Sequence, residues 1–145
     1  MSAQAPRTNP VPAPTRASRE VSPPDCSGLC VLVVDDNRDA AVALEALLDL
    51  AGARVELAFD GPSALAQAAA EVPDAVVMDL GLPGLSGHEV ARLLRDRGFQ
   101  GRLVMLSGHG EPEDQLRSLE AGADLHLVKP ADPARLLAFL AASKS

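Results

Sequence analysis

Five polar residues stand at the ends of short apolar segments, in an order suited to binding a cation and a phosphoryl group. Two adjacent acids, a third acid, a hydroxyl and a lysine each follow such a segment: Asp35, Asp36, Asp79, Ser107 and Lys129. Carboxylates ligate hard divalent cations, and a carboxylate can also attack phosphorus as a nucleophile. A lysine and a hydroxyl can stabilise charge on the oxygens of a transferred phosphoryl group. These residue types indicate phosphoryl-transfer chemistry, with Asp79 as the candidate nucleophile.

Three carboxylates that converge need a counterion. Two like charges about 4 Å apart repel by about 4 kcal/mol at an effective dielectric constant near 20. If the segments ending at Asp36 and Asp79 lie side by side, then either one carboxyl is protonated or a divalent cation and Lys129 neutralise the cluster. Oxygen ligands without a nearby His or Cys favour a hard cation. We therefore expect Mg2+, with Mn2+ as the alternative.

The segments that must position these residues alternate between apolar strands and helices. Strands are predicted at 30–34, 54–59, 74–78, 103–106 and 125–128, and helices at 38–51, 62–71, 87–97, 112–121 and 133–143. Five βα units with short connections predict an α/β fold, a parallel sheet with helices on both faces. In such a sheet ligands bind beyond the carboxyl ends of the strands, which is where the five polar residues stand.

The composition of the 145-residue chain excludes several classes of protein. The net charge of −7 opposes binding to a phosphate backbone, and an aromatic content of 2% opposes base stacking. We therefore expect no nucleic-acid partner. No apolar run approaches the roughly 20 residues of a membrane span, and no secretory signal is visible. A cytoplasmic protein without membrane insertion is the expectation.

The first part of the chain differs from the rest. Residues 1–26 are rich in proline and poor in large apolar residues, so we predict a flexible tail, followed by a folded domain over 27–145. Cys26 and Cys30 lack a second pair of ligands and do not form a disulfide framework. We expect Cys26 to be exposed in the tail and Cys30 to open a buried strand.

Four ordered motifs resemble the receiver domain of response regulators. They are VLVVDDN (31–37), VVMDLGLPGLSGHE (76–89), LVMLSGHG (103–110) and AGADLHLVKP (121–130), and the resemblance covers residues 29–143. It implies a flavodoxin-like, doubly wound (βα)5 fold with strand order 2-1-3-4-5. The stretch that begins at LSGHG is also similar to receivers of hybrid histidine kinases, which favours a phosphorelay context.

The resemblance also implies roles for individual residues. Asp79 resembles the phosphoacceptor, Asp36 the direct Mg2+ ligand, and Asp35 its water-mediated or second acidic partner. The backbone carbonyl of Gly81 would be a further metal ligand. Ser107 resembles the switch hydroxyl and Lys129 the phosphate-binding lysine, whose bond to Pro130 is often cis in the family.

Three positions depart from the common pattern of the family. His126 stands where a Tyr or Phe usually swings inward, so it is either a smaller, titratable switch residue or a surface histidine. Gly81 and His109 occupy the positions two residues after Asp79 and Ser107, and in the family these positions tune the lifetime of the phosphate. We hypothesise that Gly81 leaves water access open and that His109 modulates it.

Implied partners are a sensor histidine kinase or a histidine phosphotransfer protein as donor, and an unknown output protein. Because no output domain follows in the sequence, we expect a stand-alone regulator that acts by protein contact or as a relay or phosphate sink. It is expected to be a monomer or weak dimer, and no enzyme beyond slow self-dephosphorylation.

Two other functions are alternatives: a phosphorylation-independent binding module, and a Mg2+-dependent aspartyl-phosphate phosphohydrolase. The latter usually needs a second acid shortly after the nucleophile, where this chain has Gly81. Structural alternatives also exist for single residues. Asp35, Asp36 or Asn37 could cap the next helix, Ser107 could belong to a simple turn, and Lys129 could be a solvated surface residue.

Overall fold

A computed structural model describes residues 24–108 and 112–142. Five strands alternate with five helices: β1 (Cys30–Val34), α1 (Arg38–Leu50), β2 (Arg54–Ala58), α2 (Gly61–Ala70), β3 (Ala75–Asp79), α3 (Gly87–Asp96), β4 (Arg102–Ser107), α4 (Pro112–Glu120), β5 (Leu125–Val128) and α5 (Pro133–Ala142). The predicted elements are confirmed, and their bounds shift by a residue or two.

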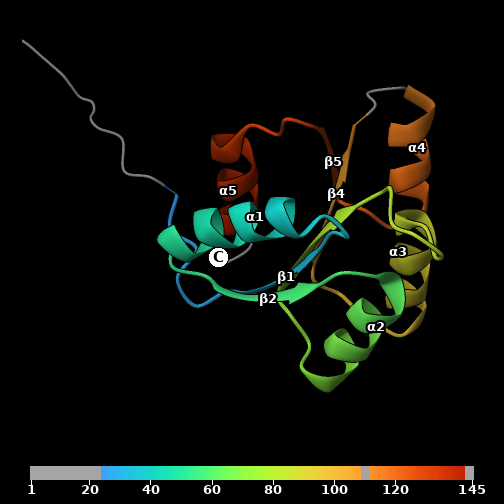
Figure 1. Ribbon diagram of the computed structural model, residues 1–145, viewed down its shortest axis with the longest axis horizontal. Coiled ribbons are helices and arrows are strands. Elements are labelled where there is room, and N and C mark those ends of the chain that lie inside the picture. The colour runs from blue at the N-terminus through green and yellow to red at the C-terminus, as the bar shows by residue number, and fades with distance from the viewer. Residues whose placement is uncertain (1–23, 109–111, 143–145) are drawn as a thin grey trace, which may run out of the picture.

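All five strands are parallel and lie in the order β2-β1-β3-β4-β5. Helices α1 and α5 cover one face of the sheet, and α2, α3 and α4 lie on the other (Figure 1). The expected doubly wound fold and strand order are therefore confirmed. Because β1 and β3 are neighbours at the centre, the residues that follow them meet at one edge of the sheet.

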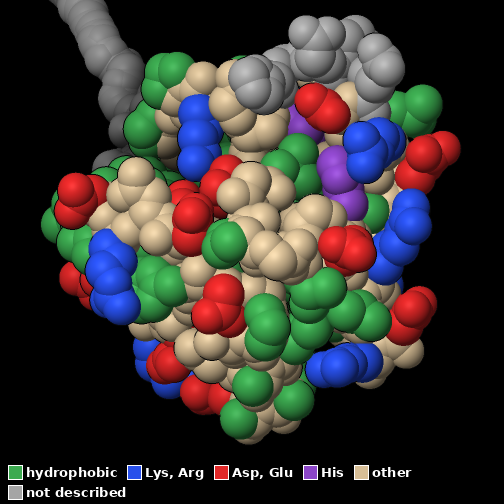
Figure 2. Space-filling model, turned by 45° about the vertical axis from the view of Figure 1, so that its right-hand side comes forward, with side chains coloured by type: hydrophobic (Ala, Val, Ile, Leu, Met, Phe, Trp, Pro, Cys, Tyr) green, Lys and Arg blue, Asp and Glu red, His purple; other side chains and the backbone are tan. Residues whose placement is uncertain are grey.

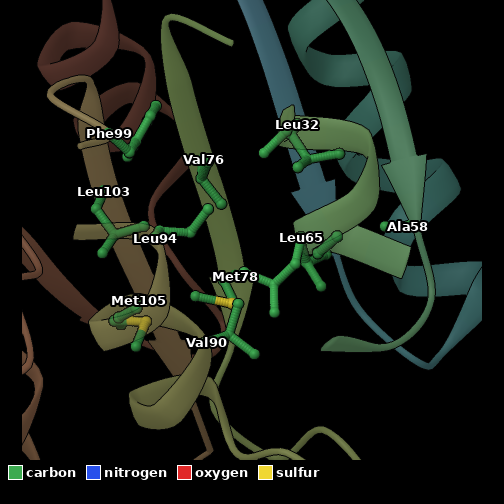
Figure 3. Close-up of a cluster of buried hydrophobic side chains, with 14 of the residues drawn as sticks. Leu32, Ala58, Leu65, Val76, Met78, Val90, Leu94, Phe99, Leu103 and Met105 are labelled. Atoms are coloured by element: carbon green, nitrogen blue, oxygen red, sulfur yellow. The ribbon is translucent and has the colours of Figure 1, made fainter. Parts of the chain in front are cut away.

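Each face of the sheet has its own apolar core. Alternate side chains of the central strands enter the two cores, which is why these strands are almost continuously apolar. The core on the α2–α3 face includes Leu32, Val76, Met78, Leu103 and Met105 (Figure 3). On the opposite face, side chains of the same strands pack against α1 and α5.

The expected exposure of Cys26 is wrong. Its side chain is fully buried in the core beneath α1 and α5, and its thiol lies 3.8 Å from the carbonyl oxygen of Leu137. The packed part of the chain therefore includes Cys26. Residues 1–23 lie outside the described residues, so the flexible tail stays a prediction there. Cys30 does begin β1, and it is only partly buried.

Side chains at the helix starts accept hydrogen bonds from backbone amides that the helices leave unpaired. Asn37 caps α1 by accepting from the amide of Ala40, so the cap is neither Asp35 nor Asp36. Ser86 and Glu89 form a reciprocal capping box at the start of α3. The two acids after β1 are thus left over for another role.

One arginine joins several loops at the amino end of the sheet. The guanidinium of Arg95 on α3 donates to the carbonyl oxygens of Phe99, Gly101 and Gly122 at 2.8–3.0 Å. It also pairs with Asp124 at 3.0 Å, whose carboxylate accepts from the amide of Leu103. This cluster fastens the end of α3 to the turns that precede β4 and β5.

Among the helices of the described residues, none combines the length and apolar character needed to cross a bilayer.

Candidate functional site

The five polar residues named from the sequence lie at the carboxyl ends of four strands. Asp35 and Asp36 directly follow β1, Asp79 is the last residue of β3, Ser107 is the last residue of β4, and Lys129 directly follows β5. Asp79 pairs in register with Leu106, so Ser107 is one residue further along the neighbouring strand. The amide of Lys129 donates to the carbonyl oxygen of Ser107 at 2.7 Å, which holds these two strand ends together.

Three carboxylates converge at the ends of the two central strands. One carboxylate oxygen each from Asp35, Asp36 and Asp79 lies within 4.8 Å of the others. The set contains only oxygen donors, which suits a hard cation of the size and charge of Mg2+. Mutual repulsion in such a cluster also favours a bound cation, because each carboxylate raises the energy of its neighbours' charged forms.

The ammonium group of Lys129 bridges two of these carboxylates. Its Nζ lies 3.2 Å from Oδ1 of Asp79 and 3.4 Å from Oδ2 of Asp35. Burial alone would lower the pKa of Lys129, but Asp79 and Asp35 together raise it above its ordinary value. The lysine is therefore charged at neutral pH, and the interpretation of Lys129 as a solvated surface residue is wrong.

The three acids differ in their access to solvent. Asp35 is only 2% exposed, and its Oδ1 accepts a hydrogen bond from the amide of Asn37 at 2.9 Å. Asp36 is exposed, and the side chain of Asp79 is 13% exposed. Asp35 is thus fixed within the fold, whereas Asp79 remains partly open to an incoming group.

Gly81 borders the carboxylate of Asp79. A Cβ atom built on Gly81 would lie 3.6 Å from Oδ2 of Asp79, an ordinary van der Waals distance. A side chain at this position would therefore begin next to this oxygen, and no backbone atom outside residues 80–82 lies within 4 Å of its Cβ. The position is consistent with the hypothesis that Gly81 leaves Asp79 accessible to water. His109, the other residue expected to tune the phosphate lifetime, lies outside the described residues.

Ser107 is connected to His126, so it does more than form a simple turn, and the switching role of His126 stays a prediction. Oγ of Ser107 lies 2.8 Å from Nε2 of His126 on β5. Nδ1 of the same ring lies 2.8 Å from Oγ of Ser118 on α4, and that hydroxyl lies 3.1 Å from Nε2 of His88 on α3. His126 is partly buried, and its ring is held from both sides.

Ser118 and His88 were missed by reasoning from the sequence. Ser118 is fully buried, although serine in a helix is commonly a surface residue. Thirty residues separate the two, and their contact depends on how α3 and α4 pack. The lone signal in the sequence is a serine among the charged residues of α4, which is too weak to indicate a role.

The peptide bond between Lys129 and Pro130 is cis, as the resemblance suggests. It lies where β5 ends and the chain turns toward α5.

Comparison with known proteins places this site in a family. The family model for the response regulator receiver domain matches residues 31–141. The transcriptional regulatory protein PrrA of Mycobacterium leprae is 43% identical over 108 residues, which cover 74% of this chain and 46% of that protein. The chain thus spans about half the length of this curated relative.

Solved structures agree with the sequence comparison. The chemotaxis protein CheY4 of Vibrio cholerae is 32% identical with a TM-score of 0.73, and the match covers 77% of this chain and 95% of that one. A BeF3-activated receiver domain, DrrB, is 29% identical with a TM-score of 0.73, and the match covers 80% and 97%. These relatives leave the expected link to hybrid histidine kinases untested. In fold, motifs and extent of the match, the chain belongs to the family of response regulator receiver domains.

Proposed function

We propose that this protein accepts a phosphoryl group on Asp79 from a phosphohistidine of a sensor histidine kinase or histidine phosphotransfer protein. The observation that carries the proposal is the position of the Asp79 carboxylate. It stands at the end of the central strand, beside two other acids and 3.2 Å from the ammonium of Lys129. This arrangement supplies a nucleophile together with a fixed positive charge for the phosphoryl oxygens.

The transfer exchanges one bond to phosphorus for another. A carboxylate oxygen of Asp79 forms a bond to phosphorus while the bond from phosphorus to the donor's imidazole nitrogen breaks. The electron pair of the broken bond returns to that nitrogen. The ammonium group of Lys129 can shift its contact from the carboxylate to a phosphoryl oxygen, because its Nζ already contacts Asp79. The hydroxyl of Ser107, on the neighbouring strand, is the candidate donor to another phosphoryl oxygen.

Mg2+ fits the three carboxylates, and we propose Asp35, Asp36, Asp79 and the carbonyl oxygen of Gly81 as its protein ligands, with Mn2+ as a substitute. The bound cation would neutralise charge on the acids and on the phosphoryl group. The amide of Asn37 already donates to Oδ1 of Asp35, which fixes the orientation of this ligand.

The proposed output is a protein contact or further relay of the phosphoryl group, rather than turnover of a substrate. Residues 80–85 are Leu, Gly, Leu, Pro, Gly and Leu, none of which has a side chain that transfers protons. Hydrolysis of an acyl phosphate on Asp79 would therefore lack a general acid or base from this loop. The proposal includes slow self-dephosphorylation and no other enzymatic activity.

The test is phosphorylation of the full chain by acetyl phosphate in Mg2+, followed by intact-mass spectrometry. Asp79→Asn should abolish the phosphorylated species, and chelation of Mg2+ should do the same for the unchanged chain. Asp39→Asn is the matched control, because Asp39 lies in the first turn of α1 but outside the carboxylate cluster. Persistent phosphorylation of the Asp79→Asn protein would refute the assignment.

A further inference from the structure

A continuous line of hydrogen-bonding groups runs from the end of β4 to the first turn of α3. Its members are the hydroxyl of Ser107, the ring of His126, the hydroxyl of Ser118 and the ring of His88. The three contacts measure 2.8, 2.8 and 3.1 Å. We name these four residues the Ser107–His88 relay. It joins four different elements, β4, β5, α4 and α3.

The sheet directs the first two members toward the same face. His126 pairs in register with Met105, and Ser107 lies two residues after Met105 on β4. Side chains two residues apart on a strand point to the same side. Met105 faces the core on the α2–α3 side, so Ser107 and His126 also face the helices of that side. The contact with Ser118 on α4 follows from this orientation.

Both histidine rings in the relay are neutral at pH 7. Burial lowers the pKa of His126, against an opposing effect of Asp114. Burial and the charge of Arg117 lower the pKa of His88, again with Asp114 opposing. Figure 2 shows histidine atoms reaching the surface among acidic and basic side chains. A neutral imidazole carries one N–H, so one ring nitrogen donates and the other accepts.

The tautomer of His126 decides whether Ser107 has a proton to give. If Nδ1 carries the hydrogen, then Nε2 is an acceptor, and the Ser107 hydroxyl must donate to it. If Nε2 carries the hydrogen, then Ser107 accepts from the ring and its own proton is directed elsewhere. The second tautomer requires a donor to Nδ1, and the hydroxyl at that nitrogen is Ser118. Ser118 can in turn accept from Nε2–H of His88.

We propose that Ser118 and His88 are positioning residues that hold His126 in its Nε2–H tautomer, so that Ser107 donates its proton to the phosphoryl group on Asp79. The proposal rests on the proposed phosphoacceptor function of Asp79. Every donor then points toward the added negative charge, in the order His88, Ser118, His126, Ser107, phosphoryl oxygen. Aligned hydrogen bonds of this kind reinforce one another.

The consequence is that the direction of donation along the hydrogen bonds would carry the signal. His126 is already held between two hydroxyls, so in this proposal recruiting Ser107 to a phosphoryl group needs no inward swing of this ring. The other end of the relay lies on α3 and α4, and these helices would sense the phosphorylation state through His88 and Ser118.

The experiment uses the full chain with Mg2+ and beryllofluoride, the activating group of the related DrrB structure. Two quantities are measured: the tautomer of His126 from its side-chain 15N shifts in NMR spectra, and the affinity for beryllofluoride. In the unchanged protein with beryllofluoride we expect His126 to be the Nε2–H tautomer, and the Nδ1–H tautomer there would contradict the proposal. Ser118→Ala should shift it toward Nδ1–H and weaken beryllofluoride binding by about fivefold, the effect of one net hydrogen bond.

A double-mutant cycle separates positioning from packing. His126→Phe keeps a ring but removes both nitrogens, so Ser118→Ala should have no effect on beryllofluoride affinity in that background. Ser118→Thr keeps the hydroxyl and should restore the tautomer and the affinity. His88→Leu should weaken beryllofluoride binding less than Ser118→Ala does. His88→Gln keeps a donor and should weaken the binding less than His88→Leu.

Two further results would overturn the proposal: an unchanged His126 tautomer in the Ser118→Ala protein, or an equal loss of affinity with and without His126. Failure of the phosphoacceptor assignment looks different, because then Asp79→Asn would bind beryllofluoride as well as the unchanged chain does. The tautomer of His126 without beryllofluoride is measured independently of that assignment.

Discussion

Removal of the ammonium group at the site should destabilise the metal-free protein and strengthen its binding of Mg2+. The perturbation is Lys129→Met, which keeps the length and much of the apolar volume of the side chain. In the unchanged protein, Nζ contacts the carboxylates of Asp79 and Asp35 at 3.2 and 3.4 Å. Without it, three acids within 4.8 Å have no fixed positive charge between them.

The magnitude follows from these distances. At an effective dielectric constant near 20, a pair of unit charges at this separation attracts by about 5 kcal/mol, an upper bound for each contact. The lysine side chain is 35% exposed, so solvent screens much of this attraction, and its removal also ends the desolvation of the ammonium. We expect a net loss of roughly 2–3 kcal/mol in the free energy of unfolding.

The assay is urea unfolding at pH 7.5 with EDTA and with Mg2+. The pKa of Lys129 is raised, so its stabilising charge is fully present below the unfolded value of about 10.4 and is lost only as pH rises through the folded value. At pH 7.5 the comparison therefore reports the charged lysine. The loss should be large in EDTA and much smaller in Mg2+, because the cation replaces the missing charge.

Arg54→Met is the matched control. Arg54 pairs with Glu56 and Glu71, but its side chain is 57% exposed. Solvent screens exposed ion pairs strongly, so this variant should lose little stability and show no dependence on Mg2+. A Lys129→Met protein that is as stable as the unchanged chain in EDTA, or that binds Mg2+ more weakly, would refute the reasoning.

Three further predictions concern neighbouring features. Gly81→Leu should lengthen the half-life of phosphorylated Asp79 severalfold, because the new side chain covers Oδ2 of Asp79; an unchanged rate of phosphate loss in a mass-spectrometric time course would contradict this. Asn37→Ala should lower the free energy of unfolding by about 1 kcal/mol, the usual effect of losing an N-cap, whereas Asn37→Asp should not. Acidification should reduce the stability advantage of the unchanged protein over His126→Phe. The pKa of His126 is lowered in the folded state, so below about pH 6.5 the unfolded chain takes up a proton that the folded chain does not. Urea titrations between pH 7 and 5 measure the difference in the free energy of unfolding between the two proteins. A difference that grows on acidification would contradict this prediction.

The sheet and the acidic site could be predicted because both depend on short-range patterns. Each strand is a continuous apolar segment, and the residue that follows it must emerge at the carboxyl edge. The meeting of Asp35, Asp36 and Asp79 then needs only the adjacency of β1 and β3. Lys129 reaches the same place from β5, across β4, because its side chain is long enough to contact Asp79.

The rest depended on packing between distant segments. Cys26 sits in a proline-rich context that predicts exposure, yet it fills space beneath α1 and α5. Leu50 is the apolar last residue of α1, yet it is 88% exposed. The partners of His126 belong to α3 and α4, whose separation is set by tertiary contacts. Local spacing holds no information about such contacts.

The two ends of the sheet are held by different kinds of contact. At the amino end, the guanidinium of Arg95 binds three carbonyl groups and one carboxylate, so one side chain holds the turns before both β4 and β5. At the carboxyl end, the charged groups are held by contacts that a cation or phosphoryl group would exchange. Contacts at the carboxyl end can therefore rearrange when a cation or phosphoryl group binds, while contacts at the amino end keep the strands in register. Loss of the Arg95 contacts, although they lie at the opposite end of the strands from Asp79, should reduce the structural difference between the unphosphorylated and the phosphorylated protein.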